Sequence, residues 1–128
     1  MTYYFSKTLA ESDLDAAEMR IRSALKEAGF GVLTEIDVTT TLKEKIGADF
    51  RPYKILGACN PDLAHKALQA EDKIGTMLPC NVVLQKVDDG VEVAAVNPVA
   101  SMQAIENSAL ASIAETVRDQ LRTVIDNL

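Results

Sequence analysis

The chain has 128 residues, of which 48% are hydrophobic and 25% charged, and its formal net charge is −6. This length and composition are typical of a globular protein with one hydrophobic core, so we expect a single domain over residues 1–128. The 13 basic residues are scattered along the chain. Nucleic-acid binding and docking on an anionic membrane surface are therefore disfavoured, because both depend on clustered Lys and Arg side chains.

The N-terminal segment, MTYYFSKTLAESDLD, has neither the basic stretch nor the apolar run of a secretory signal. No segment approaches the roughly 20 apolar residues that a transmembrane helix requires. We therefore expect a cytoplasmic protein that does not enter the membrane. Thiols stay reduced in that compartment, so a structural disulfide between Cys59 and Cys80, the two cysteines of the chain, is not expected.

The first half of the chain alternates strand and helix signals. Enrichment in Thr, Tyr and Phe predicts a strand over 2–9. Apolar residues at helical spacing then predict a helix between Ser12, a suitable N-cap, and Gly29, which suits the left-handed residue after a helix. A second strand over 31–38 runs into a short helix over 39–47, whose last residue is a helix-ending glycine.

The third strand is predicted over 53–59 and is followed directly by a helix. Asn60 is a favourable N-cap and Pro61 fills the first helical position, where its missing N–H costs nothing. The strand-to-helix turn reads GACNP and lacks both G-x-G-x-x-G and the Walker pattern. Nucleotide binding by either of these routes is therefore not expected.

A β-hairpin is predicted from two strands, over 80–87 and 91–96, that flank Asp88-Asp89-Gly90. A three-residue loop with Gly in the left-handed position fits these residues. In that register Lys86 lies opposite Glu92, as a favourable cross-strand pair.

The element order is β-α-β-(α)-β-α-β-β-α, ending in a long amphipathic helix over 107–128. The predicted hairpin makes at least part of the sheet antiparallel. The order therefore favours an α+β fold over a doubly wound parallel sheet.

Three segments in this order, YKILGACNPDLAHKAL, EDKIGTMLPCNVVL and DDGVEVAAVNP, resemble the bacterial and archaeal domain-of-unknown-function 302 family. The resemblance covers most of the chain and is strongest from Ile36 to Pro98. It implies an α+β domain similar to the TATA-box-binding-protein-like fold, with a curved, mainly antiparallel sheet, helices packed on one side, and frequent pairing as a homodimer. No activity accompanies the family, and the fold does not imply DNA binding, because this acidic chain lacks the basic sheet face that such binding would need.

The two Cys-Asn pairs, 21 residues apart, are the first candidate site. Strand alternation gives both Cys59 and Cys80 apolar neighbours on their faces, which favours small buried cysteines. In the alternative interpretation the two strands are neighbours and the thiols converge at one end of the sheet. Cys59 would then precede a helix N-terminus, whose dipole lowers a thiol pKa and favours redox or sulfur-transfer chemistry. A metal site is not predicted, because two more N or S ligands are missing.

Four other polar residues complete the candidates. His65 projects from the polar side of its helix, which removes the general base of a Cys-His nucleophile. Glu71 continues the apolar side of that helix; it either reaches water at the helix end or, if held inside, needs Lys54 or the Asn81 amide as partner and anchors a polar ligand. Asn60 is explained as an N-cap. Asn81 has no helix to cap, so it bonds neighbouring backbone or contacts a ligand.

The candidate binding residues are therefore Cys59, Asn60, Glu71, Cys80 and Asn81, with no catalytic residue, metal or cofactor predicted. The first hypothesis is a module with a pocket between the curved sheet and the long C-terminal helix, which binds a small apolar or amphipathic molecule. The second is a homodimeric structural or interaction domain that pairs through a sheet edge or an apolar face. The third is a thiol protein that uses both cysteines. We rank ligand binding first, because no acid/base pair or phosphate loop supports an enzyme.

Overall fold

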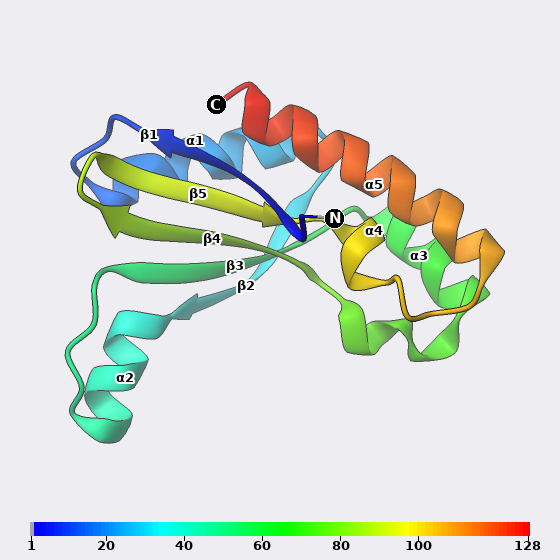
Figure 1. Ribbon diagram of the computed structural model, residues 1–128, viewed down its shortest axis with the longest axis horizontal. Helices are drawn as coiled ribbons and strands as arrows, with labels where there is room; N and C mark the ends of the chain where they lie inside the picture. The colour runs from blue at the N-terminus through cyan, green and yellow to red at the C-terminus, as the bar shows by residue number, and fades with distance from the viewer. Residues whose placement is uncertain (1) are drawn as a thin grey trace.

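The computed structural model describes residues 2–128, in which five strands form one antiparallel sheet of order β1-β5-β4-β3-β2 (Figure 1). The strands are β1 (Tyr4–Leu9), β2 (Gly31–Asp37), β3 (Tyr53–Cys59), β4 (Cys80–Val87) and β5 (Gly90–Val96). The helices are α1 (Leu14–Glu27), α2 (Val38–Ile46), α3 (Pro61–Ala70), the 3-10 helix η1 (Asp72–Met77), α4 (Pro98–Ser101) and α5 (Ser108–Asp126). The predicted α+β class and element order are confirmed, and the two short helices η1 and α4 are additions to it.

One face of the sheet is covered by α1 and α5 and holds the main hydrophobic core. Strand side chains alternate between the two faces, so every second residue points into this core. The sheet contributes Leu9, Leu56, Ala58, Cys80, Val82, Leu84, Val91, Val93 and Ala95, all buried. Ile21 and Leu25 of α1, together with Leu121 and Ile125 of α5, pack against them. Within residues 2–128, no helix has both the length and the apolar character needed to cross a membrane.

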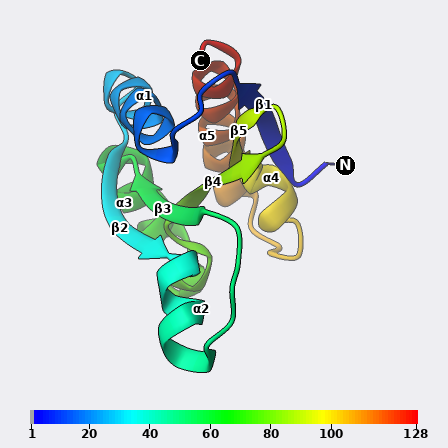
Figure 2. The same cartoon turned by 90° about the vertical axis from the view of Figure 1, so that its left-hand side faces the viewer.

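The intervening residues of the strands point to the opposite face, which we call the open face. They are half-buried or exposed: Tyr4, Tyr53, Ile55, Asn81, Val83, Gln85, Glu92, Ala94 and Val96. Figure 2 shows α1 and α5 on the same side of the sheet, with α2 well apart from both. The open face is therefore partly accessible to a ligand or a partner, although much of it is apolar.

The β4–β5 turn contains two residues rather than three, which corrects the predicted register. Gly90 already pairs with the last residue of β4, and Glu92 lies opposite Gln85 instead of Lys86. The Gln85 Nε2 group donates a hydrogen bond to Glu92 Oε1 at 2.9 Å. Gly90 has a φ of +144°, and a Cβ there would lie 1.9 Å from the Leu9 carbonyl oxygen. This glycine is thus required by the close approach of β1 and begins the strand, rather than completing the loop.

Helix α2 extends beyond the β2–β3 edge of the sheet, and none of its residues is buried (Figures 1 and 2). The Asp37 side chain caps it by accepting a hydrogen bond from the Thr40 N–H at 3.0 Å. Gly47, with a φ of +67°, ends it as predicted. Exposed apolar side chains mark this part of the molecule, since Ile46 is 73% and Ile36 49% exposed.

A cluster of four charged side chains connects α1 to β2 and β3. Lys54 Nζ lies 2.7 Å from Glu18 Oε1 and 2.8 Å from Glu35 Oε1. Arg22 completes the cluster by pairing with the second oxygen of each carboxylate, at 2.8 and 2.9 Å. Burial raises the pKa of Glu18, but the hydrogen bonds from Lys54 and Arg22 outweigh it, so the net shift is downward. The same carboxylates raise the pKa of Lys54.

Candidate functional site

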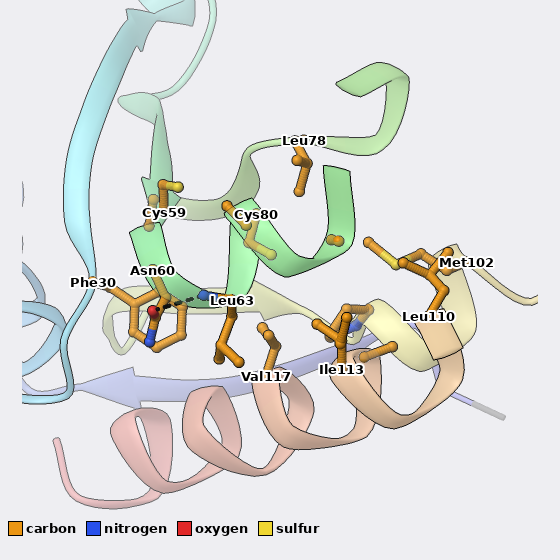
Figure 3. Close-up of a pocket in the computed structure, with 15 residues that line it drawn as sticks. Phe30, Cys59, Asn60, Leu63, Leu78, Cys80, Met102, Leu110, Ile113 and Val117 are labelled. Atoms are coloured by element: carbon orange, nitrogen blue, oxygen red, sulfur yellow. Dashed lines mark hydrogen bonds between the residues drawn. The ribbon is translucent and has the colours of Figure 1, made fainter. Parts of the chain in front are cut away.

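The two cysteines meet at one end of the sheet, as the alternative interpretation of the Cys-Asn pairs requires (Figure 3). Cys59 is the last residue of β3, and Cys80 is the first residue of β4. Cys80 pairs with Ala58, the residue before Cys59. Both line a pocket between the sheet, α3 and α5, which we call the sheet-end pocket. Its other lining residues are almost all apolar and include Phe30, Leu63, Leu78, Met102, Ile113 and Val117.

Burial keeps both thiols protonated at neutral pH. It raises the pKa of Cys80 to about 11, with a further contribution from a Cys59 thiolate, and it also raises the pKa of Cys59. This direction is opposite to the lowered pKa that a thiol redox or sulfur-transfer site needs. The position of Cys59 before helix α3 does not overcome the loss of hydration. The geometry thus favours two packed thiols over a pair of nucleophiles.

The enclosed space of the sheet-end pocket is about 30 Å³. A volume of this size accommodates a water molecule or a small methyl-sized group, whereas pockets for organic ligands typically reach about 300–1,000 Å³. Asn60 helps to close the pocket. Its Oδ1 accepts the hydrogen bond of the Leu63 N–H at 3.3 Å, as predicted for an N-cap, and its Nδ2 donates to Gln120 Oε1 of α5 at 3.4 Å. One polar atom of Asn60 therefore caps α3, and the other links α3 to α5.

Glu71 lies outside the sheet-end pocket, at the junction between α3 and η1. Its backbone N–H donates to Ala67 at the end of α3, and its Oε1 accepts a hydrogen bond from Asn107 Nδ2 at 3.5 Å. Asn107 is the N-cap of α5, so Glu71 connects two helices. The partners suggested for a buried Glu71 were wrong, because Lys54 is engaged by Glu18 and Glu35, and Asn81 lies on the open face.

Asn81 points away from Cys80 by strand alternation and lines a hollow in the open face. The hollow has a volume of about 370 Å³ and is lined by Tyr3, Tyr4, Tyr53, Asn81, Val83, Gln85, Glu92, Ala94, Ala95 and Val96. Asn81 lies opposite Gly57, where a Cβ would come within 2.1 Å of Thr34 Oγ1 and 2.6 Å of Pro79 Cγ. The glycine thus lets the P-C-N segment cross close to β3, which positions Asn81 at the rim.

The strand register gives the hollow two unlike ends. Tyr4 lies opposite Val96 at one end, beside Asn81, and its ring forms an edge-to-face contact with Tyr3 at 4.9 Å between centroids. Four residues further along the strands, Tyr53 lies opposite Gln85. The floor between these ends consists of the small apolar side chains of Val83 and Ala94. The hollow is therefore an apolar trough with aromatic corners and polar groups at both ends.

A chain of hydrogen bonds fixes the polar end near Tyr53. Arg51 Nε donates to Gln85 Oε1 at 2.8 Å, which orients the Gln85 amide so that its Nε2 donates to Glu92 Oε1. The Arg51 guanidinium also lies over the Phe50 ring, 4.4 Å from its centroid. The carboxylate of Glu92 is thereby held in place without a direct ion pair to Arg51.

Sequence reasoning missed most of the hollow. Of its lining residues only Asn81 was a candidate, on the ground that it had no helix to cap. Alternate positions of the hairpin, at Val83 and Gln85 and at Glu92 and Ala94, mix polar and small apolar side chains, as a partly solvated sheet face does. The sequence did not indicate that the tyrosines line the hollow, because their position in the sheet depends on which strands lie beside the hairpin.

The fold and this surface define a class of protein: an antiparallel α+β protein with one helix-covered sheet face and one open, hollowed face. A family model described as "Domain of unknown function DUF302" matches residues 5–128, and the chain belongs to this family. It is similar to an uncharacterized conserved DUF302 protein from Bacillus stearothermophilus, whose crystal structure aligns with a TM-score of 0.90. The two chains are 28% identical, and the alignment covers 98% of each.

The comparison with proteins of curated function found no match to this chain. The similarity to the TATA-box-binding-protein-like fold stays a prediction from the family resemblance. Among residues 2–128, no group of three or more His, Cys, Asp or Glu side chains is arranged to hold a metal ion.

Proposed function

We propose that this protein is a small-molecule-binding module whose ligand occupies the hollow in the open face. The observation that carries the proposal is the volume of about 370 Å³ together with its lining. Small-molecule sites are typically concave spaces of about 300–1,000 Å³, mostly apolar, with a few polar groups that orient the ligand. The hollow combines these properties, since Val83 and Ala94 supply an apolar floor, and Asn81 and Glu92 supply polar groups near its two ends.

The sheet-end pocket, between the sheet and the C-terminal helix, is the location expected from the sequence. Its enclosed space of about 30 Å³ is too small for an organic ligand unless α3 moves away from α5. The polar atoms of Asn60 oppose that movement, because they bond to Leu63 within α3 and to Gln120 on α5. The open face needs no such rearrangement, so it is the better-supported site.

Replacing Ala94 by Phe is expected to fill the hollow and abolish ligand binding. Ala94 lies on the floor and points away from the main core, so the larger side chain does not disturb core packing. The measurement is a titration of 15N-labelled protein with a mixture of small aromatic and aliphatic fragments. The wild type should show shifts at the amides of Asn81, Val83 and Glu92, and the variant should not.

The matched control is Ala109→Phe, which adds the same side chain at an exposed position of α5. This variant should bind the fragments like the wild type. Shifts in the wild type that cluster around Cys59 and Met102 would move the binding site to the sheet-end pocket. Wild-type protein without any fragment-induced shifts would contradict the binding function.

A second candidate function is formation of a homodimer through α2, and the exposure of this helix favours it. An isolated helix of nine residues is shorter than the about 12–15 residues that give marginal stability in water. It is therefore expected to need a packing partner, yet none of its residues is buried within the chain. Ile46 and the neighbouring Phe50 are exposed, and β2 beside them is an unpaired sheet edge. A second copy of the chain would cover both features at once.

Replacing Ile46 by Glu is expected to convert such a dimer into a monomer, because a charge at the centre of an apolar contact is costly to bury. The measurement is native mass spectrometry combined with light scattering after size exclusion. Thr41→Glu, an exposed position on the same helix, introduces the same charge and should leave the dimer intact. A wild-type protein that is monomeric at high concentration would contradict the homodimer.

A further inference from the structure

The charge distribution around the open-face hollow defines the class of ligand more narrowly. Within residues 2–128, Glu92 is the one lining residue that carries a formal charge at neutral pH. The lysines of the adjacent strands do not neutralise it. Lys54 and Lys86 point to the helix-covered face, opposite Leu84 and Val91 respectively. The hollow therefore presents one negative charge on an otherwise neutral surface.

The carboxylate of Glu92 is held in a fixed position but retains an acceptor oxygen for a ligand. Its Oε1 accepts the hydrogen bond from Gln85 Nε2 at 2.9 Å, and the described residues provide no hydrogen bond or ion pair to Oε2. Arg51 is engaged by the other end of the Gln85 amide and by the Phe50 ring. A neutral amide thus lies between the two charges, and it orients Glu92 without forming an ion pair with it.

The aromatic corners of the hollow are also suited to a cation. Tyr3, Tyr4 and Tyr53 line it, and the negative ring faces of tyrosines attract ammonium groups within about 6 Å. The chain itself places a cation over Tyr53, because the Arg51 guanidinium carbon lies 6.0 Å from the centroid of this ring. The net charge of −6 adds a long-range attraction for cations and a repulsion for anions. The carboxylate, the net charge and the rings of Tyr3 and Tyr4 favour a positively charged ligand, whereas the Arg51 guanidinium opposes a second cation at the Tyr53 ring.

From these observations we infer that the open-face hollow binds the protonated amine or quaternary ammonium group of a small amphipathic molecule. The cationic group lies beside Glu92 Oε2, and the apolar body extends over Val83 and Ala94 toward Tyr4. This inference rests on the proposed binding function and adds the ligand class to it. A phosphate- or carboxylate-bearing molecule would instead place its charge beside Glu92, which disfavours it.

Three probes of similar size test the ligand class: 2-phenylethylammonium, 2-phenylethanol and 3-phenylpropanoate. They share a phenyl ring and a two-carbon spacer and differ in the charge of the terminal group. Each is titrated into 15N-labelled protein at neutral pH, up to about 10 mM, which detects weak binding. The ammonium probe should bind at the hollow at least about tenfold more tightly than the alcohol, and the carboxylate should not bind.

Glu92→Gln should remove the preference for the ammonium probe over the alcohol, because the amide keeps the size of the side chain and loses its charge. Glu27→Gln makes the same charge change at an exposed position of α1 and should retain the preference. If the alcohol or the carboxylate bound at the hollow as well as the ammonium probe, the ligand class would be overturned and the binding function would stand. If none of the three shifted any amide of the hollow, both would be contradicted.

Discussion

Replacing Gly90 by alanine is expected to lower the free energy of unfolding by about 3 kcal/mol or more. Two effects add at this position. A side chain at a φ of +144° costs about 1–3 kcal/mol in backbone strain. The new Cβ would also lie 1.9 Å from the Leu9 carbonyl oxygen, which is backbone and can move only if β1 shifts. Overpacking of this kind costs about 1–3 kcal/mol. Equilibrium denaturation in urea measures the sum.

Gly31→Ala provides the matched control for Gly90. Gly31 is also the first residue of a strand, but a Cβ there meets no atom within 4 Å and its φ is not positive. Alanine at that position should change stability by less than about 1 kcal/mol, with either sign. Equal losses in the two variants would show that the contact with Leu9 is not what makes Gly90 necessary.

Local sequence signals were sufficient to predict helix ends that are determined by residues within one turn. Asn60 and Pro61 start α3 as predicted, since a cap and a fixed φ act within one turn. Gly47 likewise ends α2. The predicted cap of α1 was wrong by one residue, because Asp13 rather than Ser12 is its N-cap. The hairpin register was wrong, because the position of Gly90 is determined by the Leu9 carbonyl, about eighty residues earlier in the chain. Such a contact cannot be read from a turn sequence.

The candidate site was predicted only in part, because it too depends on contacts between residues that are far apart in the sequence. Convergence of Cys59 and Cys80 was one of two interpretations, and it required β3 and β4 to be neighbours, as they are. The sequence could not indicate the partner of Glu71, because Asn107 is 36 residues later in the chain, after the β4–β5 hairpin. The hollow depends on β1 lying beside β5, which brings Tyr4 next to Val96. Strand order, rather than any motif, assembles this surface.

Replacing Lys54 by methionine is expected to destabilise the protein by about 2 kcal/mol at pH 7. The lysine is the cation between Glu18 and Glu35, and its side chain and that of Glu18 are only 14% and 13% exposed. Removing one partner of a fully buried pair costs about 3–5 kcal/mol, and of an exposed pair about 0–1 kcal/mol. The cluster is intermediate, because Glu35 is 45% exposed and Arg22 still pairs with both carboxylates.

The pH dependence identifies the origin of this loss. The pKa of Glu18 is lowered in the folded protein from its ordinary value of 4.5, so its contribution is present above that value and disappears as the pH falls through the folded pKa. The pKa of Lys54 is raised from 10.5, so its contribution is present below 10.5 and is lost as the pH rises through the folded pKa. The difference between wild type and variant should therefore be largest between these limits.

Urea denaturation of wild type and Lys54→Met at pH 7 and pH 3 tests this expectation. As the pH falls from 7 to 3, the charge on Glu18 decreases and with it the repulsion in the variant, so the stability difference should be smaller at pH 3 than at pH 7. Glu18→Gln added to Lys54→Met should restore about half of the loss at pH 7, because it removes the carboxylate left partly buried without its main partner. Lys66→Met, at an exposed position of α3, should change stability by less than about 0.5 kcal/mol at either pH. A loss in Lys54→Met that is equal at both pH values would assign the role of this lysine to packing of its aliphatic stem rather than to its charge.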